Sequence, residues 1–347
     1  MPSKNKKVLV AMSGGVDSSV VAALLKKEGH DVTGVHILCW AGCENNEDKQ
    51  DAMRVAARLD IPFLVWDFKK EYKEAVFNYM IREYSAGRTP NPDVMCNKEI
   101  KFGIFLKRAL EAGANYVATG HYVRAKTSGF VSLLSAKDSS KDQSYFLWTL
   151  TQDQLKHCLF PIGDYLKSEV REIARKFDLP TAAKKDSQGL CFVGKIDFGE
   201  FLREALPKKT GAVLDSAGNK LGEHDGAHFY TLGQRHGLGI GGEPEPLFVA
   251  DKNIAANTLV VARGESDPIL YRNKLIAENL NWIKGTQPSF PLKCLARIRY
   301  RQLVQKCVLN SNGEANFDAP QRAVSPGQSI VFYSDSGEML GGGIIKS

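Results

Sequence analysis

Apolar residues in the first 120 or so positions form short runs that alternate with stretches in which they recur every three or four residues. The run "KVLVA" is typical of a buried strand, and Val20, Val21, Leu24 and Leu25 share one face of the helix predicted after it. Strands separated by helices predict right-handed β–α–β units and a doubly wound parallel sheet. The predicted strands are Lys7–Ala11, Asp31–Leu38, Pro62–Asp67 and Tyr116–Thr119, and the predicted helices are Ser18–Glu28, Glu47–Leu59, Glu71–Ser85 and Lys98–Ala112.

The pattern changes after Pro207. Glycine turns such as "SAGNKLG" and "SPGQ" separate short β-rich runs such as "LVVAR" and "SIVFY", which is typical of antiparallel structure. We therefore expect three domains. They are an α/β domain with the doubly wound parallel sheet at 1–206, a small central β domain at 207–270 and a C-terminal β-barrel at 271–347.

Composition narrows the class of protein. The 347-residue chain is 43% hydrophobic but has no run of about 18 apolar residues, so we expect no membrane span. The apolar run at 8–12 is too short for a signal peptide, which predicts a soluble, cytoplasmic protein. There, the seven cysteines are expected to be free, catalytic or metal-binding rather than structural disulfides. A formal charge of +7 favours an anionic partner such as nucleic acid without singling it out.

A glycine-rich loop, "SGGVDSS", lies between the first predicted strand and helix. Its N–H groups and the positive end of the helix can hold a phosphate, and adjacent glycines let the main chain approach it. The loop lacks both the Gly-Lys-Ser/Thr of a Walker A motif and the G-x-G-x-x-G of a dinucleotide site. Asp17 is expected either to position Mg²⁺ or to cap the helix. The residues expected to hold the phosphates and their nucleoside are Ala11, Met12, Ser13, Gly14, Gly15, Val16, Asp17 and Ser18.

This loop resembles the SGGxDS signature of the N-type ATP pyrophosphatases, or PP-loop enzymes. Such enzymes adenylate an acceptor oxygen and release pyrophosphate, so they need no lysine for the transfer of a γ-phosphoryl group. A glycine turn with chance polar neighbours is the alternative explanation. The order of strand, glycines, aspartate and helix favours the nucleotide site, but the loop alone does not identify the acceptor.

Two cysteines lie in unusual local sequences. Cys96, in "GRTPNPDVMCNKEIKF", directly precedes a predicted helix, and Lys98 and Lys101 follow it. The helix dipole and these positive charges should favour the reactive thiolate form. Cys191, in "DSQGLCFVG", is flanked by glycines, as in an exposed loop. An isolated cysteine is more often a small buried hydrophobe, so local sequence leaves both interpretations open.

Three polar stretches also allow two interpretations. Asn91–Asp93 suits a turn as well as an acid–base site. Lys141–Gln143 supplies charge and hydrogen-bonding groups. If "RIRYR" is a strand, Arg297, Arg299 and Arg301 share one face, which serves either RNA phosphates or a solvated sheet surface.

Several long motifs follow one another as they do in the bacterial tRNA-specific 2-thiouridylases, and the chain resembles that family over essentially its whole length. The motifs are "SGGVDSS", "GRTPNPDVMCNKEIKF", "ATGHY", "KDQSYFLW", "GLCFVG", "YTLGQRHGLGIGG", "RIRYR" and "SPGQSIVFY". The resemblance implies that the wobble uridine of tRNA is adenylated at its 2-carbonyl oxygen, which sulfur then replaces, with release of AMP and pyrophosphate. It makes Cys191 the persulfide carrier and Cys96 the nucleophile, leaving a transient Cys96–Cys191 disulfide.

The resemblance also assigns binding residues and partners. Ile37 and Gly120 flank the adenosine, and Asn91, Pro92 and Asp93 contact the target base, with Asp93 as an acid–base group. It implies ATP as co-substrate with Mg²⁺, tRNA, a persulfide-carrying sulfur donor protein and a monomeric enzyme. The residues to which it assigns tRNA contact are His121, Lys141, Asp142, Gln143, Arg299, Tyr300 and Gln328.

The remaining features predict less. Cys39 and Cys43 lack the further ligands of a recognised zinc set. Cys158, Cys294 and Cys307 are expected to be packing residues. The predicted helix at Lys167–Phe177 mixes both charge signs, so we expect it to be an ordinary solvated surface.

Two alternative functions stay open at this point. One is a PP-loop ligase or amidotransferase acting on another acceptor, although this leaves the two cysteines without a role. The other is an RNA-binding protein with a vestigial ATP site, against which the intact loop argues.

Overall fold

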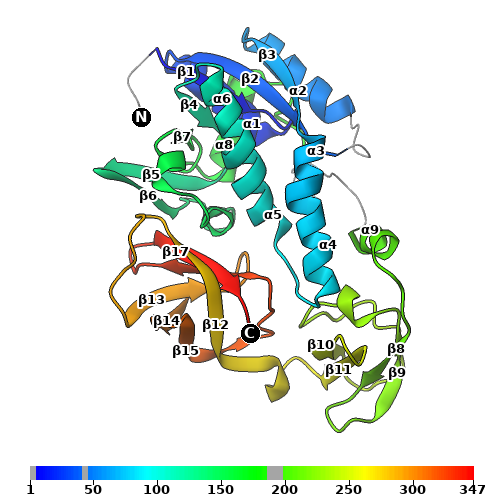
Figure 1. The fold of residues 1–347 in the computed structure, drawn as a ribbon. Coiled ribbons are helices and arrows are strands. Elements are labelled where there is room, and N and C mark those ends of the chain that lie inside the picture. Colours follow the sequence, from blue (N-terminus) through cyan, green and yellow to red (C-terminus); the bar gives the residue numbers. More distant parts are fainter. Residues whose placement is uncertain (1–4, 41–45, 186–197) are drawn as a thin grey trace.

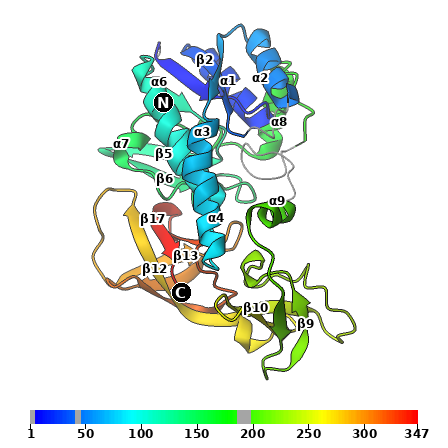
Figure 2. The same cartoon turned by 45° about the vertical axis from the view of Figure 1, so that its right-hand side comes forward.

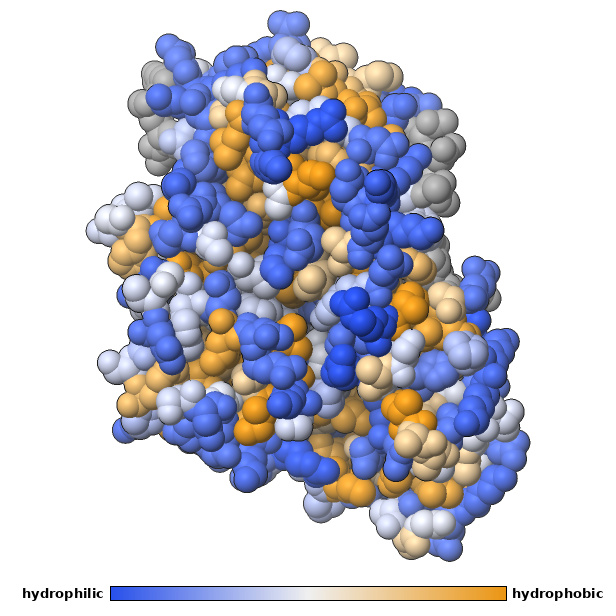
Figure 3. Space-filling model, in the orientation of Figure 1, coloured by the Kyte–Doolittle hydropathy of each residue, from blue (hydrophilic) through white to orange (hydrophobic). Residues whose placement is uncertain are grey.

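The computed structural model describes residues 5–40, 46–185 and 198–347. A parallel sheet covered by helices lies at one end of the molecule, and two β-rich units lie at the other (Figure 1). The long helical segment formed by residues 69–85 extends from the parallel sheet toward both units, as the turned view shows (Figure 2). No helix in the described part of the chain is long and apolar enough to cross a membrane. On the face in Figure 3, hydrophobic residues form separate patches among hydrophilic ones.

The parallel sheet has the strand order β3-β2-β1-β4-β7. Its strands are β1 (Lys7–Ala11), β2 (Asp31–Leu38), β3 (Phe63–Asp67), β4 (Tyr116–Ala118) and β7 (Cys158–Leu159). Along β1, Val8 and Val10 belong to one hydrophobic cluster, whereas Leu9 and Ala11 belong to another. Because successive side chains of a strand point to opposite faces, both faces of the sheet are buried. The predicted doubly wound sheet is confirmed.

Three helices cover one face of this sheet: α1 (Val16–Lys27), α2 (Asn46–Arg58) and α8 (Lys167–Lys176). The expectation that α8 is only a solvated surface is wrong. Val170 and Ala174 are fully buried in the cluster that also contains Val20 and Val21 of α1. The apolar residues of α8 are four apart and so form a narrow stripe, which its many charged residues hide in the sequence.

Two helical runs cover the other face. The first comprises α3 (Lys69–Tyr72), the π-helical η1 (Lys73–Phe77) and α4 (Asn78–Ser85), and the second comprises α5 (Pro92–Met95), the π-helical η2 (Cys96–Ile104) and α6 (Phe105–Glu111). The second run begins at Pro92, six residues before the predicted helix start at Lys98. Proline is favoured at the first helical position, and Asn91 caps the helix by accepting a hydrogen bond from the Val94 N–H.

The central unit is a four-stranded sheet in the order β10-β11-β8-β9. Its elements are β8 (Gly211–Leu214), β9 (Lys220–His224), η4 (Ala227–Phe229), β10 (Leu247–Asn253) and β11 (Thr258–Arg263), and α9 (Phe198–Ala205) precedes them. The pairing of β8 with β11 is parallel, which departs from the antiparallel expectation.

The last unit is the predicted barrel, closed by the pairing of β12 with β17. After η5 (Pro268–Leu270), its strands are β12 (Tyr271–Trp282), β13 (Leu292–Arg297), β14 (Gln305–Leu309), β15 (Glu314–Arg322), β16 (Ser329–Tyr333) and β17 (Glu338–Ile345).

A β-hairpin of the α/β unit extends the barrel sheet. The sequence did not predict this pairing. β5 (Val123–Ser128) and β6 (Phe130–Ser135) pair with each other, and Leu133 and Leu134 of β6 pair with Met339 and Glu338 of β17. The segment that follows contains η3 (Ser144–Phe146) and α7 (Gln152–Leu155) and places Tyr145, Leu147 and Trp148 in a cluster shared with Val331 and Tyr333. The barrel is therefore packed firmly against the α/β unit rather than tethered to it.

Candidate active site

The glycine-rich loop lies where β1 ends and α1 begins, at the carboxyl edge of the parallel sheet. Gly14 has a φ of +80°, and a side chain there would clash with the main chain of Asp48. Gly15 is the N-cap of α1 and supplies no side-chain hydrogen bond, so the first-turn N–H groups need another acceptor. Asp17 is consequently not the helix cap, which corrects one of its two expected roles. This arrangement fits the phosphates of a nucleotide.

Gly120 and Ile37 complete the predicted nucleotide site on the neighbouring strands. A side-chain carbon at Gly120 would lie 3.0 Å from the N atom of Ser18, so the chain after β4 passes directly over the start of α1. The Met12 N–H donates to the Val35 carbonyl (2.8 Å), and Ile37 lies further along β2, buried in the cluster that contains Ala11. Three separate segments thus meet at one edge of the sheet, as ligand sites in open α/β folds do.

A lysine distant in sequence lies beside this loop. Lys167, the first residue of α8, places its Nζ 2.7 and 2.8 Å from the two carboxylate oxygens of Asp17, and the Tyr122 hydroxyl donates to the same carboxylate. The Lys167 side chain is only 13% exposed. The loop lacks a lysine of its own, and α8 supplies a cation from 150 residues away. Sequence analysis missed this residue because only the packing of α8 on α1 reveals it.

The same contacts bear on the expected metal ion. Both carboxylate oxygens of Asp17 are engaged by Lys167, so the carboxylate would have to exchange this cation before it could bind Mg²⁺. In the described part of the chain, no group of three or more His, Cys, Asp or Glu side chains could hold a metal ion. Cys39 is buried, and Cys43 lies outside the described residues.

The loop expected to contact the target base connects α4 to α5. At its start, the Arg88 guanidinium binds the carboxylate of Glu83 through two hydrogen bonds of 2.5 and 2.6 Å. Gly87 packs against Ile254 of the central unit, where any side chain would clash. This loop therefore rests on the central sheet as well as on its own helix.

The barrel holds the other side of this loop. The Thr89 N–H donates to the Pro326 carbonyl (2.8 Å), and Nε2 of Gln328 donates to the carbonyls of Thr89 (3.0 Å) and Pro90 (3.2 Å). Gly327 has a φ of +91°, and a side chain there would strike the main chain of Thr89. The segment 325–328 of the barrel thus fixes the main chain just before Asn91.

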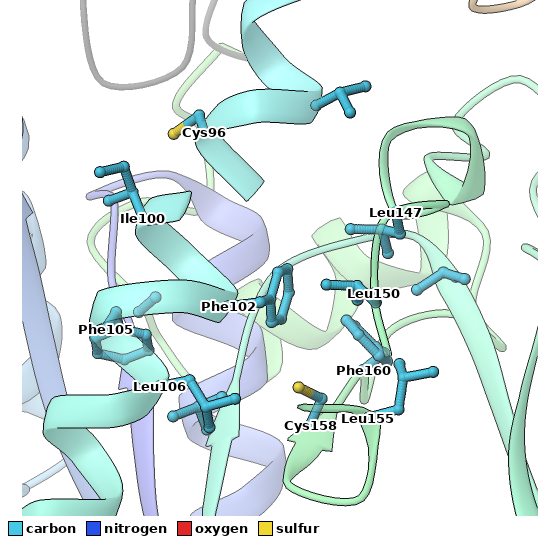
Figure 4. Close-up of a cluster of buried hydrophobic side chains, with 14 of the residues drawn as sticks. Cys96, Ile100, Phe102, Phe105, Leu106, Leu147, Leu150, Leu155, Cys158 and Phe160 are labelled. Atoms are coloured by element: carbon cyan, nitrogen blue, oxygen red, sulfur yellow. The ribbon is translucent and has the colours of Figure 1, made fainter. Parts of the chain in front are cut away.

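Cys96 lies at the junction of α5 and η2 and is fully buried (Figure 4). It is not at the helix start, because the helix already begins at Pro92. Lys98, expected to supply positive charge to the thiol, forms an ion pair with Glu99 (3.1 Å). Asp93 is half-buried in the first turn of α5. Cys191 lies outside the described residues, so its pairing with Cys96 stays a prediction.

Apart from Gln328, the residues assigned to tRNA contact fall into three groups, and the first has structural partners. The Asp142 carboxylate is 3% exposed, accepts hydrogen bonds from the Ala136 and Ser144 N–H groups and forms an ion pair with Arg297 (3.1 Å). It joins the α/β unit to the barrel. Gln143 accepts a hydrogen bond from the Tyr122 N–H (3.0 Å).

The second group is the "RIRYR" segment with Lys141. The strand expectation for it is wrong, because β13 ends at Arg297 and Arg301 has a φ of +64°. The three arginines therefore do not share a face. Arg299 donates to the Ala323 carbonyl (2.5 Å), and the Tyr300 ring packs against Phe146, with centroids 4.5 Å apart. Arg299, Tyr300 and Lys141 are half-buried, so each keeps accessible surface.

His121 is buried against Phe102 and Phe160, and its Nδ1 hydrogen-bonds the Thr119 hydroxyl at 2.8 Å. Burial, assisted by the charge of Lys101, lowers the pKa of His121 well below 6.5. A buried neutral histidine suits the wall of the site better than a contact with an RNA phosphate.

Acid should destabilise the protein through His121. The unfolded chain binds a proton at this residue below pH 6.5 and the folded chain does not, so stability falls as the pH drops below that value. Between about pH 7.5 and pH 5.5 we expect His121 to account for roughly 1 kcal/mol of lost unfolding free energy. Urea titrations at both pH values should show a smaller loss for His121→Asn. The exposed His236→Asn is the control and should behave like the wild type; equal losses in all three proteins would contradict the account.

Comparison with known proteins identifies the family. The family described as "tRNA methyl transferase HUP domain" matches residues 6–195, "tRNA methyl transferase PRC-barrel domain" matches 199–263 and "Aminomethyltransferase beta-barrel domain" matches 272–345. The chain is 48% identical to the tRNA-specific 2-thiouridylase MnmA of Bacillus velezensis over 99% of this chain and 95% of that one. It is 48% identical to the protein of the same name from Francisella philomiragia over 99% of both chains.

The chain belongs to the tRNA-specific 2-thiouridylase family. This is a family of sulfurtransferase enzymes, so the resemblance drawn from the motifs is confirmed. Among solved structures, this chain is similar to the "U34-tRNA thiolase NcsA from Methanococcus maripaludis". The two share 16% identity and a TM-score of 0.38 over 58% of this chain and 66% of that one. A likeness this distant carries no argument about the reaction.

Proposed function

We propose that this protein converts the wobble uridine of tRNA to 2-thiouridine in an ATP-dependent reaction. The observation that carries the proposal is the 48% identity, over 99% of the chain, to relatives named as tRNA-specific 2-thiouridylases. The glycine loop at the start of α1, with the Lys167–Asp17 pair beside it, supports the use of ATP.

The proposed chemistry has two stages. The 2-oxygen of the uridine attacks the α-phosphorus of ATP, and pyrophosphate leaves. Sulfur carried as a persulfide on Cys191 then replaces the oxygen at C2, and that oxygen departs with AMP, which is a far better leaving group than the carbonyl oxygen alone. The sulfane sulfur ends in the thione, and Cys96 and Cys191 are left as a disulfide that a reductant must open. Two routes give this outcome: the persulfide attacks C2 directly, or Cys96 first releases hydrosulfide, which then attacks C2.

The chain's own groups have defined tasks in this scheme. The first turn of α1 binds the triphosphate, and Lys167 keeps the carboxylate of Asp17 from repelling it. Asn91, Pro92 and Asp93 receive the base, which must leave the anticodon stack to reach them. Asp93 exchanges a proton with it. A persulfide-carrying donor protein reloads Cys191, Mg²⁺ accompanies ATP, and the enzyme acts as a monomer.

One reaction separates this function from the alternatives. The protein is incubated with unmodified tRNA, ATP and a persulfide source, and AMP, pyrophosphate and thiouridine are quantified. Equal amounts of all three support the proposal. AMP and pyrophosphate without thiouridine would instead indicate a ligase or amidotransferase, and tRNA binding without ATP turnover would indicate an RNA-binding protein.

Gln328 offers a test of how the barrel serves this reaction. Both hydrogen bonds that its side-chain amide donates go to the loop before Asn91, so we expect it to position the target-base loop rather than to bind RNA. Replacement by methionine removes both donors, and we expect kcat for thiolation to fall about tenfold, with the tRNA dissociation constant little changed. Gln305→Met, on β14, is the control. A weakened tRNA affinity with normal kcat would show that Gln328 binds RNA directly.

A further inference from the structure

Two arginines converge where the barrel meets the central unit. Arg299 follows β13, and Arg322 ends β15 opposite Tyr271, the first residue of β12. A side-chain carbon at Gly233 of the central unit would lie 3.5 Å from Nη2 of Arg299 and 3.8 Å from Nη1 of Arg322. Both guanidinium groups therefore lie close to the same point on the 231–237 loop, where a side-chain carbon would also lie 2.8 Å from Cβ of Ala323.

The charge at this junction is poorly balanced. Within the described residues, Arg322 forms an ion pair with Glu265, whose carboxylate oxygen is 3.7 Å from Nε and belongs to a side chain that is 73% exposed. Nε and Nη2 of Arg322 are buried and make no hydrogen bond within the described structure. Arg299 is held against this second cation by its bond to the Ala323 carbonyl. Buried guanidinium donors without acceptors are unfavourable unless an anion completes them.

Packing alone does not explain this arrangement. The Arg322 guanidinium lies 4.7 Å from the centroid of the Phe248 ring, which accounts for a contact between the two units. That contact uses the face of the guanidinium and leaves the in-plane N–H donors unsatisfied. The Arg322 side chain is 23% exposed, and because Nε and Nη2 are buried, this exposed surface lies on its other atoms. Arg235, on the same loop as Gly233, is exposed. Paired guanidinium forks are the groups that best match a phosphate.

We propose that Arg299 and Arg322 together form a phosphate-binding notch that holds the sugar–phosphate backbone of the RNA substrate at the junction of the barrel and the central unit. The notch rests on the proposed function for the identity of its ligand. Its role is to position the RNA rather than to take part in the chemistry. The new part of the proposal is the role of Arg322 in binding phosphate, because the family resemblance assigns tRNA contact to Arg299 but not to Arg322.

The experiment measures binding of unmodified tRNA over a range of salt concentrations, without ATP or sulfur donor. Arg322→Met removes the charge and leaves a shorter, apolar side chain beside Phe248. We expect about tenfold weaker binding and a plot of log affinity against log salt that is shallower by about 0.7–0.9. Arg322→Lys keeps the charge and should retain the wild-type slope while losing part of the affinity. Lys293→Met, an exposed change at the far end of β13, controls for net charge.

The outcomes distinguish this notch from the reaction itself. Unchanged kcat at saturating tRNA, with the lost affinity and shallower slope, supports the notch. A wild-type slope in Arg322→Met, or an equal effect of Lys293→Met, overturns it. If Arg322→Met lowers the melting temperature, the two lysine variants decide instead. A greater loss of tRNA affinity in Arg322→Lys than in Arg299→Lys would contradict a phosphate that both residues bind. Failure of the wild-type protein to form thiouridine would refute the proposed function while leaving the salt dependence to decide the notch.

Discussion

Replacement of Cys96 by serine should abolish thiouridine formation, with a decrease of at least about 10³-fold. A serine hydroxyl cannot form the disulfide with Cys191 that releases the sulfur, whereas ATP and tRNA binding do not need the thiol. Pyrophosphate release in a single turnover should therefore survive, whereas AMP, which leaves only together with the displaced oxygen, should not form. Cys191→Ser should give the same result, because a serine cannot carry the persulfide. Quantifying thiouridine in digested tRNA, with AMP and pyrophosphate from the same samples, checks both variants.

The chain offers a matched control in Cys158. This residue is buried in the same cluster as Cys96 (Figure 4), and its thiol donates to the Gln154 carbonyl at 3.1 Å. Burial raises the pKa of the Cys158 thiol, which keeps it unreactive. Cys158→Ser preserves the hydrogen bond and should remain active. Substantial thiolation by Cys96→Ser, or equal loss in Cys158→Ser, would show that the assignment of Cys96 is wrong.

Lys167→Met should reduce pyrophosphate release by about 10²-fold or more. Lys167 Nζ is the cation that neutralises Asp17 beside the glycine loop, and an uncompensated carboxylate there would repel the triphosphate. Adding Asp17→Asn to this variant should restore part of the activity, because it removes the repelling charge. Pyrophosphate release with saturating tRNA gives the measurement.

Lys176→Met is the control for this prediction, since Lys176 ends the same helix and lies far from the loop. It should retain wild-type activity. A Lys167→Met enzyme as active as Lys176→Met would exclude a role for Lys167. No recovery in the double variant would show that Lys167 acts on the triphosphate itself rather than through Asp17.

The sequence predicted those parts of the fold that local patterns determine. The short apolar runs of β1 and β2 and the amphipathic α1 predicted a parallel sheet, because each signal lies within a few neighbouring residues. The helix start near Cys96 was placed too late. Pro92 preceded by Asn91 is a helix-start signal, but the same residues are typical of a turn, and only the hydrogen bond to Val94 distinguishes them.

Contacts between distant segments could not be predicted. Nothing local in β6 indicates that it pairs with β17, some 200 residues later. The alternation in "RIRYR" predicted a strand, but the buried ion pair of Arg297 with Asp142 and the positive φ of Arg301 end it. Lys167 and Gln328 gain their roles from partners more than 100 residues away. Candidate chemistry could thus be read from motifs, whereas the residues that position it required the structure.

The fate of the displaced oxygen tests the central claim most directly. We would supply tRNA that carries oxygen-18 at C2 of the target uridine, allow a single turnover with ATP and a persulfide source, and measure the mass of the AMP. Adenylation of the base predicts one oxygen-18 atom in each AMP formed, in step with thiouridine. Unlabelled AMP accompanying thiouridine would show that the oxygen never reached the α-phosphorus and would contradict the mechanism.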